Sequence, residues 1–166
     1  MAVKGIIVET EAYSQEEASC HGHHRKTKSN SPIFGEPGTL YIRKTYGLHY
    51  CLNLVTDNIG FASGVLIRSV EIENQDERSA SGPGLVARTF QLDLNFNSLR
   101  IYSNKYLKIY DCGIKFNDKE IVNARRIGIT KAADLKWRWY LKKSRSISKR
   151  QNGDKKPRKE SFSKHK

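Results

Sequence analysis

The chain has 166 residues, of which 37% are hydrophobic and 10% aromatic, so it can form one folded domain and is not a largely disordered protein. It contains no apolar run near the roughly 18 residues of a membrane span, no signal-peptide pattern, and three cysteines too widely spaced for a disulfide framework or a zinc site. The net charge of +13 indicates a polyanionic partner, although most of it lies in residues 142–166, whose net charge of +9 leaves +4 for residues 1–141.

The first predicted element is a strand over residues 5–13 (GIIVETEAY), a segment rich in β-branched residues. Side chains alternate between the two faces of a strand, so Glu9 and Glu11 share one face with Ile7 and Tyr13. Two acidic side chains are therefore expected beside apolar ones.

Residues 14–38 are polar and predict a long surface excursion, of the kind that is usually either functional or disordered. Two strands follow over residues 39–46 and 48–55, and they meet in a hairpin at Tyr46. In the second strand leucines alternate with polar residues. If the leucines face the core, Asn53 faces the opposite surface.

A further strand is predicted over residues 61–72, where Arg68 lies among apolar neighbours and needs a partner or a ligand for its charge. A helix is predicted over residues 81–92, because the opening Ser-Gly-Pro suits an N-cap and a first turn. Later strands are predicted over residues 106–111, 120–129 and 135–141.

These elements predict an α/β (α+β) fold: a single domain with a mainly antiparallel mixed sheet, a protruding β-hairpin and few helices. We expect the domain over residues 1–149 and a basic, disordered tail over residues 150–166. Such a tail is either simply solvated or also binds nucleic acid phosphates.

Taken one at a time, these polar residues are ordinary, because a lone carboxylate on a strand is usually solvated. The His-rich loop at residues 20–24 lacks the spacing of zinc ligands, so no metal site is expected there. An ordered set of motifs is more specific: IVETEAY (7–13), His21, PGTLYIRKTYGLHYCLN (37–53), VLIRSVE (65–71), ASGPG (80–84), RRIGI (125–129) and SISKR (146–150). In order and spacing this set resembles the alkyladenine (3-methyladenine) DNA glycosylase family over about residues 5–149.

The resemblance implies that Glu11, the second glutamate of ETEAY, is the general base for the hydrolytic water. Arg68 would help to hold that water and the nearby backbone phosphate, and the main-chain carbonyl of Ile127 is a further candidate ligand. One carboxylate can serve both as the base and as a negative charge beside an oxocarbenium-like sugar.

The same resemblance implies a pocket for a flipped base. Tyr13 and His21 would pack against the base, with a main-chain group at His21 also reading its edge. Asn53 would crowd the exocyclic amino group of normal guanine, and Tyr46 would wedge into the gap left by the flipped nucleotide. Ordinary packing within the hairpin is the alternative role for Tyr46.

The implied activity is that of a monofunctional DNA glycosylase, which flips alkylated or deaminated purines out of double-stranded DNA and hydrolyses the N-glycosidic bond in base excision repair. The sequence offers no lysine nucleophile beside the pocket and no metal or iron–sulfur motif, so we expect hydrolysis without lyase chemistry and without a cofactor. Such an enzyme is expected to act as a monomer in the cytoplasm or nucleoid, with no membrane partner.

The chain departs from the family pattern at several positions. Arg43 stands where members generally have a tyrosine facing the base; a guanidinium can still stack there, but its charge opposes a cationic methylpurine and shifts preference toward neutral lesions such as hypoxanthine. Leu85 and Ser29 replace a lysine and an arginine that would contact phosphates. The chain also begins almost at the catalytic strand, where members have a helix and at least one strand ahead of ETEAY.

Two alternatives stay open from the sequence. The first is a truncated, catalytically weak or inactive DNA-binding member of the same family. The second is a basic RNA-binding or ribosome-associated protein, which would explain the basic tail but not ETEAY, Asn53 and Arg68 together.

Overall fold

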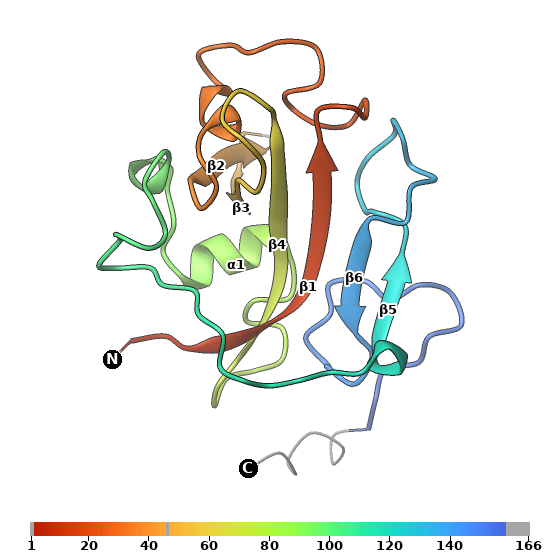
Figure 1. The fold of residues 1–166 in the computed structure, drawn as a ribbon. Coiled ribbons are helices and arrows are strands. Elements are labelled where there is room, and N and C mark those ends of the chain that lie inside the picture. Colours follow the sequence, from red (N-terminus) through yellow and green to blue (C-terminus); the bar gives the residue numbers. More distant parts are fainter. Residues whose placement is uncertain (1, 46, 159–166) are drawn as a thin grey trace.

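A computed structural model describes residues 2–45 and 47–158 and contains one open six-stranded sheet of order β2-β3-β4-β1-β6-β5 (Figure 1). All of its strand pairs are antiparallel. The strands are β1 (Gly5–Ser14), β2 (Leu40–Thr45), β3 (His49–Leu54), β4 (Ser63–Ile72), β5 (Ile121–Ala124) and β6 (Arg138–Leu141). The helices within the described residues are α1 (Pro83–Thr89) and the short 3-10 helices η1 (Ser31–Phe34), η2 (Leu94–Phe96) and η3 (Asp118–Glu120). The predicted fold class is confirmed.

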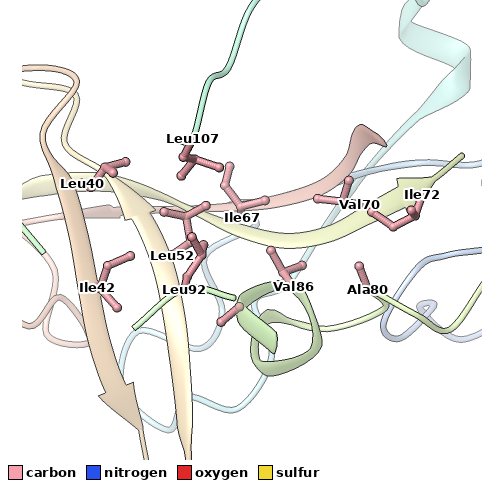
Figure 2. Packing of buried hydrophobic residues seen from close by; sticks show 11 residues of the cluster. Leu40, Ile42, Leu52, Ile67, Val70, Ile72, Ala80, Val86, Leu92 and Leu107 are labelled. Carbon is pink, nitrogen blue, oxygen red and sulfur yellow. The ribbon is translucent and has the colours of Figure 1, made fainter. Parts of the chain in front are cut away.

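The helix α1 packs on one face of the sheet, which we call the helix side. A cluster of buried side chains fills the space between the helix and the strands, as Figure 2 shows. Its members are Leu40, Ile42, Leu52, Ile67, Val70, Ile72, Ala80, Val86, Ala87, Leu92 and Leu107. These residues come mostly from β2, β3, β4 and α1, so the helix side supplies the main core.

The opposite face of the sheet, which we call the loop side, is covered by the long connection between β1 and β2. Tyr41 and Ile42 are neighbours on β2 and point to opposite faces. Ile42 belongs to the helix-side core, whereas Tyr41 packs with Cys20, Ile33 and Phe34 of the connection. The predicted excursion over residues 14–38 is therefore packed against the sheet along much of its length.

The pairing of β1 with β4 is interrupted by two extra residues. Ile7 pairs with Val70 and Glu9 pairs with Ser69, so Val8 of β1 has no pairing partner in β4. Thr10 then pairs with Ile67, so Arg68 of β4 has no pairing partner in β1. A bulge changes which face the following side chains point to. The prediction that Ile7 shares a face with the two glutamates is wrong for this reason: Ile7 packs on the helix-side core, whereas both glutamates face Arg68.

The later strands are shorter than predicted or absent. Residues 106–111 form no strand but belong to an irregular segment that runs from η2 to η3 (Figure 1). Tyr106 and Tyr110 in this segment are largely exposed, and strand propensity alone does not form a strand without a neighbouring edge to pair with. Residues 120–129 and 135–141 form strands only over β5 and β6.

The segment after β6 packs back on the domain. Ser144, Ser146 and Ile147 are buried. Further along, Asp154 accepts hydrogen bonds from the Tyr140 hydroxyl at 2.7 Å and from Arg150 at 2.8 Å. Residues 159–166, the rest of the predicted tail, lie outside the described residues. No helix within the described ranges is long and apolar enough to cross a membrane.

Candidate active site

A row of five residues crosses the loop side of the sheet, one from each of β2, β3, β4, β1 and β6. In that order they are Tyr41, Asn53, Leu66, Glu11 and Arg138, each paired in register with the next. Directly opposed residues of antiparallel strands point to the same face. The sheet therefore places Asn53 and Glu11 on one surface with only Leu66 between them.

The carboxylate of Glu11 is fully buried, with 0% of the residue exposed, and three groups hold it. Its Oε1 accepts a hydrogen bond from the main-chain N–H of Ile127 at 2.8 Å. Its Oε2 accepts one from the Tyr13 hydroxyl at 2.9 Å and lies 3.2 Å from Nη1 of Arg68. Tyr13, Arg68 and Ile127, all named from the sequence, thus meet at Glu11, and Ile127 contacts it through its main-chain N–H. The predicted role of the Ile127 carbonyl in holding the water stays a prediction.

Glu9 lies beside this group and is as deeply buried. It accepts hydrogen bonds from Arg138 at 2.8 Å, from the Ser69 hydroxyl at 2.8 Å, and from the N–H and hydroxyl of Ser148 at 2.8 and 2.9 Å. Nε of Arg68 is 3.5 Å from Oε1 of Glu9, so Arg68 bridges the two glutamates. Two guanidinium groups balance two carboxylates here, and this pairing compensates for burying the charges.

Tyr13 and Tyr41 border the same surface as protonated phenols. Burial, followed by the charge and the hydrogen bond of Glu11, raises the pKa of Tyr13 above its ordinary value. Burial raises the pKa of Tyr41 to about 12. Both hydroxyls therefore keep their protons at neutral pH, and that of Tyr13 donates to Glu11.

His21 lies over Tyr41, with ring centroids 6.0 Å apart, an interplanar angle of 19° and a hydrogen bond between its Nδ1 and the Tyr41 hydroxyl. Its main-chain carbonyl accepts a hydrogen bond from the Asn30 amide at 2.9 Å, which fixes the backbone. The Asn53 amide nitrogen donates to the Tyr41 carbonyl at 3.1 Å. Burial, and then the charge of Arg43, lower the pKa of His21, so its ring is neutral at pH 7.

The remaining predicted site residues lie toward the hairpin. Arg43 follows Tyr41 by two positions on β2, so it points to the same side, and its side chain is exposed. Tyr46, predicted to insert into DNA, lies outside the described residues. The structure thus brings Glu11, Arg68, Tyr13 and Ile127 into contact and places Asn53, His21 and Arg43 along the neighbouring surface.

Four residues around this site were not predicted from the sequence: the buried Arg138, Arg126 and Glu17, and the partly buried Ser148. Arg138 carried a usable signal, because it is a charged residue between aromatic ones in a predicted strand, as Arg68 is among apolar ones. The others lie in turns and loops, where no periodicity indicates burial. Their partners are far away in the sequence.

No cation site is evident around the two glutamates. Within residues 2–45 and 47–158, no group of three or more His, Cys, Asp or Glu side chains could hold a metal ion. The nearest positive charges are those of Arg68 and Arg138.

The arrangement can support a hydrolytic reaction on a planar group. A buried carboxylate held by an arginine and two hydrogen-bond donors can orient and deprotonate a water molecule. Aromatic rings and an amide on the adjoining surface can stack on and discriminate a heterocycle.

Comparison with known proteins gives a consistent result. The family model described as methylpurine-DNA glycosylase matches residues 1–145. A protein of Trichodesmium erythraeum is 36% identical over 164 residues, which cover 89% of this chain and 82% of that protein. A protein of Carboxydothermus hydrogenoformans is 40% identical over 158 residues, which cover 88% of this chain and 82% of that protein. Both are provisionally named 3-methyladenine DNA glycosylases. The chain therefore belongs to the methylpurine-DNA glycosylase family.

Proposed function

We propose that this chain is a monofunctional glycosylase that flips alkylated or deaminated purines out of duplex DNA and hydrolyses their N-glycosidic bonds. Membership of a DNA glycosylase family supports DNA repair chemistry in general. The observation that carries the finer proposal is the Glu11 carboxylate, fully buried between Arg68, Tyr13 and the Ile127 N–H. Such an enzyme would work inside the cell on the chromosome, as a monomer and without a cofactor.

In the proposed reaction the bond between C1′ of the sugar and N9 of the purine breaks, and its electron pair leaves with the base. The oxygen of a water molecule forms the new bond to C1′, and a proton of that water passes to Glu11. A purine already carrying a positive charge from alkylation leaves as a neutral base, whereas hypoxanthine also takes up a proton from solvent. The negative charge of Glu11 stabilises the oxocarbenium-like sugar between these events.

Base flipping is supported by the surface that adjoins Glu11. Extruding a base costs a few kcal/mol, and stacking on aromatic side chains recovers part of it. Tyr13 and His21 offer rings to the base, and Asn53 lies on the same face as the carboxylate. Tyr46 at the hairpin is the proposed wedge.

We further propose that the pocket prefers neutral lesions to cationic ones, because Arg43, two positions after Tyr41 on β2, would put a positive charge beside the bound base. Replacing it by tyrosine should therefore favour cationic lesions. We expect the Arg43→Tyr variant to change the ratio of 7-methylguanine to hypoxanthine excision by about 10-fold, which corresponds to about 1.4 kcal/mol. The measurement is single-turnover excision of each lesion from the same duplex, with Lys44→Tyr, a neighbouring exposed cation, as the control.

The activity is tested on duplexes that carry a single hypoxanthine, ethenoadenine or 3-methyladenine analogue, with and without alkali afterwards. Alkali cuts DNA at abasic sites, so the proposal predicts strand cleavage only after alkali. Cleavage without alkali would contradict hydrolysis without lyase chemistry. Binding to the lesion duplex with no cleavage under either condition would instead favour the inactive DNA-binding alternative.

A further inference from the structure

A second buried ion pair lies next to Glu11 and takes no part in the reaction described above. Arg126 and Glu17 are both buried, and the guanidinium donates to both carboxylate oxygens, from Nη1 at 2.7 Å and from Nη2 at 2.9 Å. Glu17 is fixed further by the N–H and hydroxyl of Ser19. This fork-to-fork geometry is the most directional ion pair that arginine makes.

The pair joins two loops that border the site. Glu17 lies just beyond the end of β1, and Arg126 lies in the loop between β5 and β6, which runs beside that end of β1 (Figure 1). Arg126 also donates to the carbonyls of Ala12 at 2.9 Å and Ala132 at 3.2 Å. Four hydrogen bonds from one guanidinium therefore fix the loop against the catalytic strand, immediately after Glu11.

Each oxygen of the Glu11 carboxylate accepts a hydrogen bond from a residue that adjoins Arg126. The N–H that contacts Oε1 belongs to Ile127, the next residue in the chain. The hydroxyl that contacts Oε2 belongs to Tyr13, whose ring centroid is 4.6 Å from Cζ of Arg126. A cation over an aromatic face stabilises that ring position.

We propose that Arg126, locked by Glu17, is a positioning residue that sets the orientation of the Glu11 carboxylate and of the Tyr13 ring against a flipped base. The inference rests on the proposed function, because it assigns Arg126 to the same site. Arg126 is buried and donates to Glu17, Ala12 and Ala132, so we place its effect on Glu11 through Tyr13 and Ile127. Its loss should therefore affect the chemical step more than the binding of DNA.

The test compares Arg126→Met with Arg126→Lys, which keeps the charge but not the forked geometry. Because a catalytic group displaced by about 1 Å can lose about 100-fold in rate, we expect Arg126→Met to lower single-turnover excision of hypoxanthine by about 10- to 100-fold. Affinity for a duplex with a tetrahydrofuran abasic-site analogue, which has no base to hold, should change less than about threefold. Arg126→Lys should restore the rate only partly, since lysine cannot pair in a bidentate manner.

A spectroscopic measurement isolates the Tyr13 ring from catalysis. In the Glu11→Gln background, the fluorescence of an ethenoadenine base in the duplex should be quenched when that base stacks on Tyr13. Adding Arg126→Met should weaken that quenching. The matched control is Arg145→Met, which removes another arginine–glutamate pair, with Glu77, away from the site. It should leave the rate and the quenching unchanged.

The outcomes separate this inference from the proposed function. A wild-type protein that excises no lesion would contradict the proposed function, whereas the quenching experiment would still report on Tyr13. If wild type is active, an unchanged rate in Arg126→Met overturns the inference. An equal loss of excision and of abasic-duplex affinity overturns it as well, because that pattern indicates a general structural role. Should Arg126→Met fail to fold, the variants Arg126→Lys and Glu17→Gln test the inference instead. The same two quantities are then measured: the single-turnover excision rate and the affinity for the abasic-analogue duplex.

Discussion

Glu9 and Glu11 lie two residues apart on one strand but have different surroundings. Glu9 contacts Arg138, Ser69 and Ser148 as well as Arg68, so its carboxylate ties strands β1, β4 and β6 to the segment after β6. Glu11 shares only Arg68 with it. We therefore expect Glu9 to be chiefly a structural carboxylate. Substituting it should lower the melting temperature as well as activity, because it leaves the buried Arg138 without its carboxylate partner and Arg68 with Glu11 alone.

Asn53 allows a separate test of base selection at the residue scale. Its amide is tied to the Tyr41 carbonyl and faces the same side as Glu11, so it can act as a steric barrier to the amino group of guanine. The Asn53→Gly variant should excise guanine lesions faster relative to adenine lesions. The measurement is the ratio of 7-methylguanine to ethenoadenine excision in single turnover. An unchanged lesion profile would mean that Asn53 does not line the pocket.

Individual residues were predictable from the sequence where a charge interrupts an apolar pattern. Arg68 stood out for this reason, and its contact with both glutamates accounts for its burial. The donor from Ile127 could not be predicted, because a main-chain N–H has no sequence signature. Glu17 and Arg126 could not be paired either, since nothing in their local sequence indicates a common position.

Among the elements, those with strong periodicity were predicted well. The first four strands and α1 lie within the predicted ranges apart from the last residue of β1, because alternation and turn residues define them. The predicted strand over residues 120–129 instead ends at Ala124. Arg126 turns inward to Glu17, and Gly128 has a φ of +75°, so the chain cannot continue as an extended strand.

The attachment of the β5–β6 loop to the end of β1 gives a prediction about pH. Burial alone would raise the pKa of Glu17, but hydrogen bonds from Arg126 and Ser19 outweigh it and lower that pKa below 4.5. The pair thus stabilises the fold fully above pH 4.5, and this contribution is lost as pH falls through the folded-state pKa.

Glu17→Gln should therefore cost about 3 kcal/mol at pH 7, since it leaves a buried guanidinium without a full partner. The difference in stability between wild type and variant should shrink steadily below pH 4.5. Urea denaturation at pH 7 and at pH 3.5 measures both quantities. A difference that is equal at the two pH values would show that the pair does not stabilise the fold as an ion pair.

At the scale of the whole molecule, the basic C-terminal region has two different parts. Residues 142–158 contribute buried side chains and supply Ser148 to Glu9. The resemblance at SISKR (146–150) places residues 142–149 in the domain, where Ser144, Ser146, Ile147 and Ser148 lie. Charge alone did not indicate the contacts of residues 150–158, because a basic segment without periodicity is usually a solvated tail. Residues 159–166 add a net charge of +2.

Two truncations separate these parts. Removing residues 159–166 should leave the fold intact and reduce the salt dependence of binding to undamaged DNA by about 1–3 in the log–log slope, if the tail contacts phosphates. Removing residues 142–166 should abolish folding, since it exposes the core around Ile147 and leaves Glu9 without Ser148. Circular dichroism and salt titrations measure the two effects. A folded protein lacking residues 142–166 would contradict the structural role of this segment.

The central claim is that Glu11 activates the hydrolytic water, and Glu11→Gln tests it most directly, because glutamine keeps the size of the side chain and removes its charge and its basicity. The measurement is single-turnover excision of hypoxanthine, with Glu16→Gln, an exposed acid just beyond β1, as the matched control. We expect the rate to fall by about 10²- to 10⁴-fold while affinity for the lesion duplex is kept or tightens. A correctly folded Glu11→Gln protein that excises at nearly the wild-type rate would contradict the claim.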